Sequence, residues 1–307
     1  DVDVLTLTFD ATKTLFFCTA LVFVVTWLTR YATAAVLRRL LPNRKRRKAS
    51  KIVQATSECA QYTFFFILGV RLLSNYAHMH SPLYWFSSAF NRTTIFTDIF
   101  TPSYTHDSSI KTYYLLYAGR YLSNFLSVLL EPRKKDFVAM QIHHLSTFVL
   151  VLLSYSANFL CIGSIIMVLL DIADPPLHAA KTFLYLGHTW WADRCFEVFA
   201  VSFFVTRIIF FGRIVWECWG LTLGGAVSGE VGRSVLGSNL LLGVLFLLQL
   251  YWFWLIAAVA VKQAKGGNAT DTRSDSEDSD DGEEDDEWNE GDDANAVVAP
   301  QDMKKFN

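Results

Sequence analysis

Long apolar segments are the feature that most restricts what this 307-residue chain can fold into. A helix needs about 20 apolar residues to cross roughly 30 Å of hydrocarbon. Runs of about this length recur at residues 14–41, 59–77, 112–131, 137–155, 158–180, 193–219 and 237–262. Hydrophobic residues make up 52% of the chain, which is too many for an ordinary soluble protein. The sequence therefore predicts an all-α integral membrane protein with about seven transmembrane helices. A count of six stays open because some runs carry charges, such as Arg71 and Asp171.

Lysine and arginine residues are concentrated in alternate loops. Eight of them lie between Arg38 and Lys51, three more at 133–135, and Lys181 and Arg194 lie near the loop after the fifth run. Basic residues beside membrane helices remain on the cytosolic side. We therefore expect a multi-pass protein with a lumenal N-terminus and a cytosolic tail. The first run lacks a basic flank before it and a small-residue cleavage site after it, so it is interpreted as a retained span.

Three regions follow from this pattern. Residues 1–50 hold a lumenal segment, the first span and a basic loop; residues 51–265 form the main membrane domain; residues 266–307 form an acidic tail. The tail has too few apolar residues to offset chain entropy and is expected to be disordered. Acidic residues follow its serines, which makes Ser274, Ser276 and Ser279 candidate phosphorylation sites. Asn91 begins an Asn-Arg-Thr glycosylation pattern in a predicted lumenal loop.

Ionisable residues inside the spans fall mainly on two consecutive helices. His143 and His144 lie in the fourth run, and Asp171 and Asp174 lie in the fifth, three residues apart and therefore expected on one helical face. The two prolines at 175–176 directly follow and are expected to break or kink that helix. Ionisable residues are costly in a bilayer and usually mark function. Counted from the basic end of each helix, His143 and Asp174 are both seven residues deep, or roughly 10 Å at about 1.5 Å per residue. We therefore expect both histidines and both aspartates to meet at one level. The five cysteines lack paired spacing, and no metal site is predicted.

A specific resemblance covers these same residues. The chain is similar, in order and spacing over residues 133–181, to the signature of the ceramide synthases, the TLC-domain family also known from the longevity-assurance proteins. The matching residues are RKKDF at 133–137, Met140, His143, His144, Thr147, Ser154, Tyr155, Asn158, Gly163, Asp171, Asp174, Leu177 and Lys181. The later stretches FFVTRIIFFGRIVW and YWFWLI, and RSDSED in the tail, extend the likeness over residues 51–280. The expected fold is one helix followed by a six-helix TLC bundle.

Two positions depart from the family pattern. Leu170 stands where the family has a histidine, and His178 stands where it has an acidic residue. Leu170 puts any role of that histidine in doubt. His178 is seven residues beyond Asp171 on the same expected face, where it could partly substitute. The homeobox-like insert found in some members is absent.

The resemblance implies transfer of a fatty acyl group from acyl-CoA to the amine of a sphingoid base, giving ceramide or dihydroceramide in the endoplasmic reticulum membrane. A neutral histidine suits a base or an acyl-accepting nucleophile at physiological pH. We expect His143 to attack the thioester and His144 to handle protons, with Asp171 and Asp174 orienting a histidine or binding the ammonium. Direct transfer with His143 as general base stays open. The expected substrate-binding residues are Arg133, Lys134, Lys135, Ser154, Tyr155, Asn158, Arg207 and Arg213.

Other classes of protein remain as alternatives. A zinc-dependent hydrolase of the alkaline-ceramidase type could use His143 or His144 with His178 and Asp174, and a non-catalytic TLC protein could sense or transport lipid. A desaturase would need several histidine boxes, and this chain has one adjacent pair. The expected partners are a sphingoid base, acyl-CoA as co-substrate, the bilayer, and a second synthase in a homo- or heterodimer. Neither nucleic acid nor a bound cofactor is expected.

Overall fold

The computed structural model describes residues 2–40, 49–74, 108–130, 135–157, 159–224 and 229–264. All the regular elements in these ranges are helices. In chain order they are α1 (Val2–Leu40), α2 (Ala49–Leu73), α5 (Ser108–Leu130), α6 (Phe137–Ser156), α7 (Leu160–Asp171), α8 (Asp174–Leu186), α9 (Thr189–Phe203), η3 (Phe204–Phe210), α10 (Phe211–Leu223) and α11 (Gly229–Ala264). The predicted all-α class is confirmed. The predicted acidic tail and Asn91 lie outside the described residues.

Helices occupy all seven of the predicted apolar runs, but five segments are long and apolar enough to cross a membrane by length and composition. These are Lys13–Leu37, Phe137–Ser156, Ile162–Leu186, Thr189–Gly220 and Arg233–Gln263. The other two runs fall in α2, which carries Glu58 and Arg71, and in α5, whose Arg120 and four tyrosines are buried by the surrounding helices. The count of seven transmembrane helices therefore stays a prediction.

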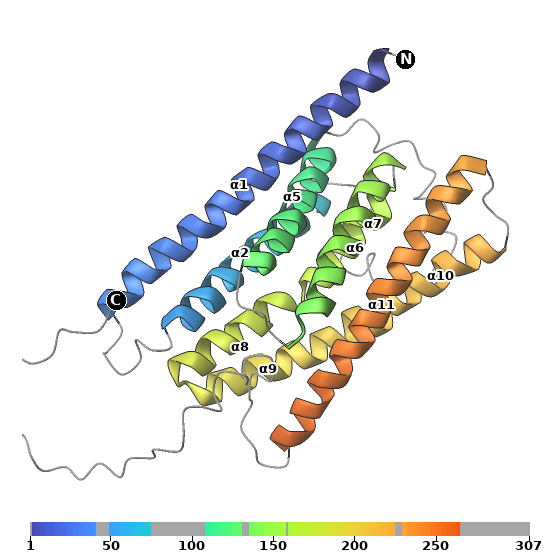
Figure 1. The fold of residues 1–307 in the computed structure, drawn as a ribbon. Coiled ribbons are helices and arrows are strands. Elements are labelled where there is room, and N and C mark those ends of the chain that lie inside the picture. The colour runs from blue at the N-terminus through green and yellow to red at the C-terminus, as the bar shows by residue number, and fades with distance from the viewer. Residues whose placement is uncertain are drawn as a thin grey trace, which may run out of the picture.

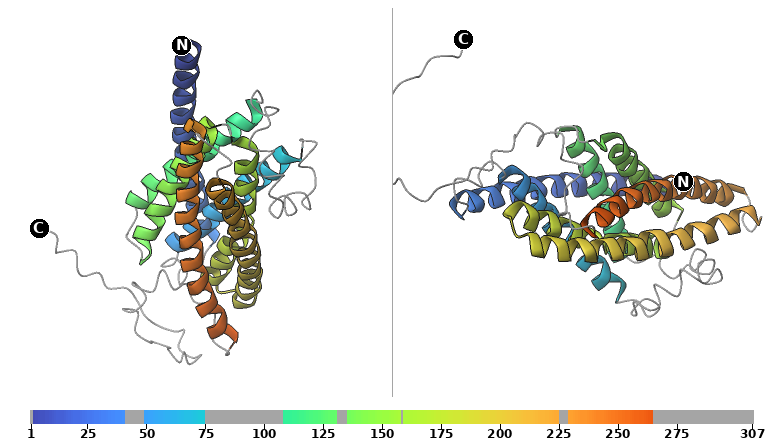
Figure 2. Two further views of the ribbon diagram at one scale, coloured as in Figure 1. Left: turned by 90° about the vertical axis from the view of Figure 1, so that its right-hand side faces the viewer. Right: turned by 90° about the horizontal axis from the view of Figure 1, so that it is seen from below.

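The helices form a bundle in which neighbours in space are often distant in sequence (Figure 1). Helix α1 packs along α5 and α2, α2 packs on α8, and α8 packs on α9. Helix α6 lies between α5 and α11, while α11 also contacts η3 and α10. Figure 2 shows α9, η3 and α10 running on as one long rod beside α11. Helices α5, α6, α8, η3 and α11 thereby face a shared interior.

The fifth predicted run is not one continuous helix. Helix α7 ends at Asp171, two residues intervene, and α8 begins at Asp174 with prolines in its first turn. Proline has no backbone N–H and tolerates the first turn of a helix, where that N–H has no acceptor. Pro175 and Pro176 thus explain where α8 starts, as the sequence indicated. The break also means that Asp171 and Asp174 do not share the face of a single helix.

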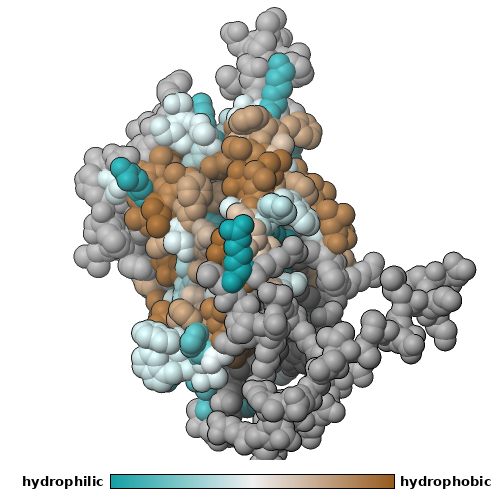
Figure 3. All heavy atoms as spheres, turned by 90° about the vertical axis from the view of Figure 1, so that its left-hand side faces the viewer, coloured by the Kyte–Doolittle hydropathy of each residue, from teal (hydrophilic) through white to brown (hydrophobic). Residues whose placement is uncertain are grey.

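The outside of the bundle is strongly apolar. Large hydrophobic side chains are exposed along α1, α6, α9 and α11, among them Phe16, Val138, Val198 and Leu247. In the view of Figure 3, hydrophobic residues form a broad band in which hydrophilic side chains are few and isolated. An exposed apolar surface of this extent suits contact with lipid tails rather than with water. It supports the reading of the chain as an integral membrane protein.

Helices α1 and α5 approach each other closely at Gly119. A Cβ added there would lie 2.8 Å from the backbone nitrogen of Thr19 and 2.9 Å from the carbonyl carbon of Cys18. Backbone atoms cannot move aside as the end of a side chain can, so the two helices would have to separate.

We expect Gly119→Ala to lower the stability of the purified protein by about 1–3 kcal/mol, the usual cost of overpacking. The matched control is Gly237→Ala, where the nearest atom would be a Leu153 methyl at 3.9 Å. Thermal unfolding in detergent checks this expectation. Equal melting temperatures for the two variants would show that α1 does not pack on α5 in this way.

Candidate functional site

Two adjacent histidines on α6 face the interior of the bundle. His144 is buried and His143 is partly buried, and their ring centroids lie 5.4 Å apart. Tyr121 of α5 lies 5.8 Å from each ring, and Trp252 of α11 meets His143 edge-on at 5.2 Å. The Nδ1 atoms of both histidines are buried and have no hydrogen-bond partner among the described residues. Each imidazole is thus held by aromatic packing, with polar capacity left for a ligand.

A main cavity of about 270 Å³ lies beside the two histidines. Its walls come from every helix of the described residues except α10. His143, His144 and Asp174 line it together with Arg207. Three of the four predicted catalytic residues therefore meet at one cavity. Asp171 does not line it.

A second, apolar side cavity of about 90 Å³ lies on the other side of His143. Its lining is almost entirely apolar and includes Val151, Ile166 and Leu242. It runs along α6 from His143 to Ser154, eleven residues or about 16 Å of helix. Four residues line both cavities and define the junction between them: Tyr121, His143, Leu170 and Gln249. A molecule with a polar end and a long apolar end could occupy both cavities with its middle beside His143.

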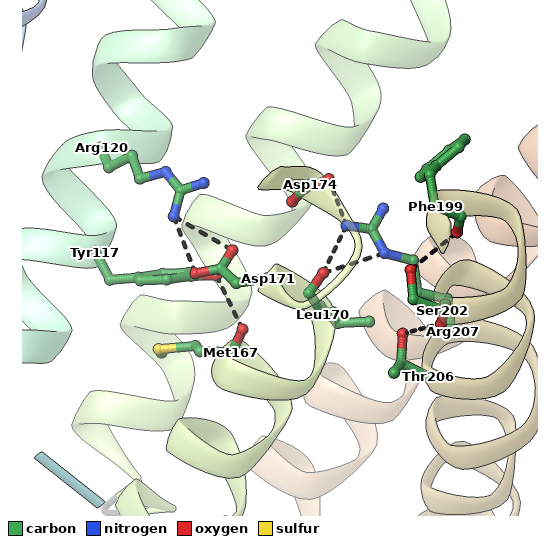
Figure 4. Close-up of polar contacts among 10 residues, drawn as sticks. All are labelled: Tyr117, Arg120, Met167, Leu170, Asp171, Asp174, Phe199, Ser202, Thr206 and Arg207. Atoms are coloured by element: carbon green, nitrogen blue, oxygen red, sulfur yellow. Dashed lines mark hydrogen bonds and ion pairs between the residues drawn. The ribbon is translucent and has the colours of Figure 1, made fainter. Parts of the chain in front are cut away.

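Asp171 forms a buried ion pair with an arginine of a different helix. Nη1 of Arg120 lies 3.2 Å and 3.3 Å from the two carboxylate oxygens, and the Tyr117 hydroxyl donates to Oδ1 at 3.1 Å (Figure 4). The Arg120 side chain is fully buried. Its guanidinium carbon also lies 4.4–5.7 Å from the ring centroids of four aromatic residues, Tyr62, Phe65, Tyr117 and Tyr121. Such stacking and the carboxylate together offset the loss of water around the charge.

Asp174 is held in a similar way from the opposite side. Nη2 of Arg207 donates to Oδ1 of Asp174 at 2.7 Å and to the Leu170 carbonyl at 2.6 Å (Figure 4). Arg207 lies in η3, where the backbone widens into a π-helix, a feature often found at functional sites. The described residues contain no hydrogen bond from either aspartate to His143 or His144. The triad-like contact that the sequence led us to expect is absent from this geometry.

A third charged group occupies the α1, α2 and α8 wall of the main cavity. Nδ1 of His178 lies 3.1 Å from Oε2 of Glu58, and Arg30 approaches the other carboxylate oxygen at 3.6 Å. The His178 ring stacks on Tyr62 with centroids 4.7 Å apart and a 12° interplanar angle. Glu58 of α2 thus places a carboxylate beside the position where the family pattern carries one on α8. His178 and Asp174 line the same cavity, as the sequence suggested.

Other predicted substrate-binding residues are more scattered. Ser154 lines the side cavity and donates to the Phe159 carbonyl at 2.9 Å, which stabilises the turn between α6 and α7. Tyr155, Lys135 and Arg213 do not line either cavity, and Arg213 pairs with Glu217 on its own helix. Six predicted site residues lie outside the described residues, namely Arg133, Lys134, Asn158 and the three tail serines.

Several site residues were not found from the sequence. Arg120 and Gln249 each lie in an apolar run, Glu58 directly precedes one, and each of the three is polar. A charge inside a membrane helix is itself a signal, and Arg120 with Asp171 could have been proposed as a pair on that ground. Gln249 carries no charge, and nothing in its local pattern separates it from an ordinary helix residue. Among the residues that the structure describes, no three His, Cys, Asp or Glu side chains converge as a metal site would require.

Comparison with known proteins identifies a family. The TLC domain matches this chain over residues 51–258, which is more than half of its length. The chain is 36% identical to ceramide synthase LOH2 of Arabidopsis thaliana over 176 residues, which cover 55% of this chain and 60% of that protein. It is 37% identical to ceramide synthase 4 of Bos taurus over 168 residues, covering 54% of this chain and 42% of that protein.

A fungal protein matches over a longer stretch. The chain is 33% identical to sphingosine N-acyltransferase lag1 of Schizosaccharomyces pombe over 229 residues, covering 71% of this chain and 57% of that protein. The matched part of the chain thus spans between 42% and 60% of the length of these three relatives. The TLC-domain match over residues 51–258 includes the helices that carry the histidines and the aspartates.

The buried pair of Arg120 and Asp171 gives a stability prediction. We expect Arg120→Met to destabilise the protein by about 3–5 kcal/mol, because it leaves the Asp171 carboxylate buried without its counter-ion. Arg194→Met is the matched control, since Arg194 pairs with Glu197 at the surface and both side chains are about half exposed. That change should alter stability by no more than about 0.5 kcal/mol. Equal unfolding midpoints for the two variants would contradict the inferred importance of the buried pair.

Proposed function

The chain belongs to the TLC-domain family, and we propose that it is a ceramide synthase that transfers a fatty acyl group from acyl-CoA to the amine of a sphingoid base. The observation that carries this proposal is the position of His143 at the junction of two cavities of different character. The names of the similar proteins, ceramide synthase and sphingosine N-acyltransferase, point to the same reaction.

The two cavities suit the two halves of an acyl-CoA. The apolar side cavity would take the acyl chain, since burying each methylene stabilises binding by about 0.8 kcal/mol. The main cavity, with Arg30, Lys181 and Arg207 in its walls, would take the CoA portion and the polar end of the sphingoid base. The thioester then falls between them, beside His143. The charged lining of the main cavity and the apolar lining of the side cavity support this orientation over the reverse one.

The histidines supply the proton and nucleophile chemistry. In one route, a nitrogen of His143 attacks the thioester carbon, CoA leaves as the thiolate, and the amine then displaces the imidazole to give the amide. In the other, His143 removes a proton as the amine attacks the thioester directly. In the covalent route, His144 would take the proton of the attacking amine as the His143 imidazole leaves; in the direct route, it would pass the proton that His143 removes to the departing sulfur. The unpartnered Nδ1 atoms of both rings support these roles.

We assign the two aspartates as positioning residues rather than as members of a triad. Asp171 holds Arg120 and Tyr117, and the neighbouring Tyr121 ring packs on both histidines. Asp174 holds Arg207 at the cavity wall. Their carboxylates thus fix the surroundings of the imidazoles. Asp174 also lines the cavity, where its charge favours the approach of a sphingoid ammonium.

The cellular setting is part of the same proposal. We place the protein in the endoplasmic reticulum membrane because the family resemblance implies it, and its apolar spans and basic loops support a lumenal N-terminus and a cytosolic tail. Lys135, with Arg133 and Lys134 beside it in sequence, would then lie on the side from which CoA arrives. We also propose that the protein associates with a second synthase. We propose phosphorylation at three serines of the tail, Ser274, Ser276 and Ser279.

The proposal is tested with purified protein, sphinganine and acyl-CoAs of increasing chain length. We expect N-acyl sphinganine and one free CoA per product molecule, and we expect His143→Ala to abolish both. Intact-protein mass spectrometry separates the two routes, because an acyl adduct that is lost in His143→Ala indicates the covalent one. Lack of any N-acyl product with every chain length would refute the proposed function.

The assignment of the side cavity gives a second expectation. Val235 lines its far end, fourteen residues or about 21 Å along α11 from Gln249. Val235→Phe should shift the ratio of kcat/KM values about tenfold towards shorter acyl donors, because it removes room for the end of the chain. Val244→Phe is the control on the same helix, since Val244 is 38% exposed and lines neither cavity. If both variants keep the wild-type chain-length profile, the acyl chain does not bind in this cavity.

A further inference from the structure

Gln249 is a buried amide at the junction of the two cavities. It lies on α11, its side chain is 1% exposed, and it lines both the main cavity and the side cavity. Its Oε1 atom has no hydrogen-bond partner in the described part of the chain. A buried amide without a partner is costly, and the cost rises where no water can reach it. A group of this kind at a cavity junction is expected to bind a polar atom of a ligand.

The neighbours of Gln249 place it across from His143. Helix α11 packs directly on α6, and Trp252, one turn beyond Gln249, meets the His143 ring edge-on at 5.2 Å. The indole Nε1 of Trp252 is also buried without a partner. The other junction residues, Tyr121 and Leu170, lie on α5 and α7. Gln249 is therefore the amide that α11 presents at the level of the reacting histidine.

Acyl transfer creates a need for a donor at this point. When a nitrogen attacks the thioester carbon, the electron pair of the C=O bond moves to the oxygen, which becomes negatively charged. The pair returns as the carbon–sulfur bond breaks and CoA leaves as the thiolate, and a histidine takes the proton that the amine loses when it attacks. Donors held in place for that oxygen lower the barrier in either of the two routes. An amide can turn over about its last bond and so present its N–H to the junction.

We propose that Gln249 is a further catalytic residue whose amide N–H donates a hydrogen bond to the acyl oxygen as it becomes an oxyanion, with the Trp252 N–H as a second donor. This inference rests on the proposed acyl transfer and adds the group that stabilises its transition state. It gives the buried indole N–H of Trp252 an acceptor, and it gives the N–H of the turned-over Gln249 amide the same acceptor. It also explains why both lie on the face of α11 that packs against the histidine helix.

The test compares Gln249→Met with wild-type protein in the sphinganine and acyl-CoA assay. Methionine keeps nearly the same length and volume but has no N–H. We expect kcat to fall about 10²–10³-fold, as for loss of an oxyanion donor, with little change in the KM for acyl-CoA. Binding of an S-alkyl CoA thioether, which lacks the carbonyl oxygen, should equal that of wild type. Trp252→Phe should lower kcat by a smaller factor.

Two further variants keep the test decisive. Gln263→Met makes the same exchange on the same helix outside both cavities and should retain wild-type kcat. Gln249→Glu keeps the shape of the side chain, and its charge opposes the oxyanion, so it should be at least as slow as Gln249→Met. Wild-type kcat in a folded Gln249→Met or Gln249→Glu protein would overturn the inference. Equal loss of thioether binding and turnover would instead assign Gln249 a structural role. An inactive wild type would refute the proposed function itself.

Discussion

Two arginine–aspartate pairs hold the break between α7 and α8, and the rest of the site depends on them. Arg120 holds Asp171 at the end of α7, and Arg207 holds Asp174 at the start of α8 together with the Leu170 carbonyl. An interrupted helix exposes polar backbone groups that are costly in hydrocarbon unless protein side chains bind them. Arg207 of η3 binds the Leu170 carbonyl and Tyr117 of α5 donates to the Met167 carbonyl, so side chains of two other helices meet this need. The break can therefore persist, and it opens the interior where the main cavity lies.

The same pairs explain why the histidines stay available for chemistry. Both carboxylates are already bound to guanidinium groups, so neither draws an imidazole into a hydrogen bond. His143 and His144 are fixed instead by the rings of Tyr121 and Trp252. Aromatic contacts set the position of an imidazole without occupying its nitrogens. The site thus combines rigid placement with unbound nitrogen atoms, which an acyl-accepting or proton-accepting histidine requires.

The sequence predicted the helices and the histidines well because both leave a local signal. Apolar runs located every described helix, and two adjacent histidines in such a run marked the site directly. Pro175 indicated a break in this helix, but the effect of the break on the two aspartates was not predicted. The three-residue spacing of Asp171 and Asp174 implied that both lie on one helical face, whereas each carboxylate pairs with an arginine of a different helix. Arg120, Glu58 and Gln249 reach the site through contacts between helices distant in sequence, and spacing along one helix carries no information about such contacts.

The departures from the family pattern have different physical outcomes. At 178, a histidine replaces the acidic residue, and Glu58 of α2 brings a carboxylate within 3.1 Å of it, so the charge is present from another helix. At 170, a leucine lines both cavities where the pattern has a histidine, and only its backbone carbonyl contacts Arg207. The first change preserves the polarity of the main cavity. The second leaves the junction with one histidine from α6 and the amide of α11.

In the proposed mechanism a single acyl donor occupies both cavities, and its thioester lies beside His143 where the cavities meet. A structure of the purified protein with a bound S-alkyl CoA thioether, determined by electron cryomicroscopy, would show this directly. We expect the alkyl chain in the apolar side cavity, the CoA portion in the main cavity, and the linking sulfur beside His143. An alkyl chain that lies in the main cavity or on the lipid-facing surface, with the junction empty, would contradict this mechanism.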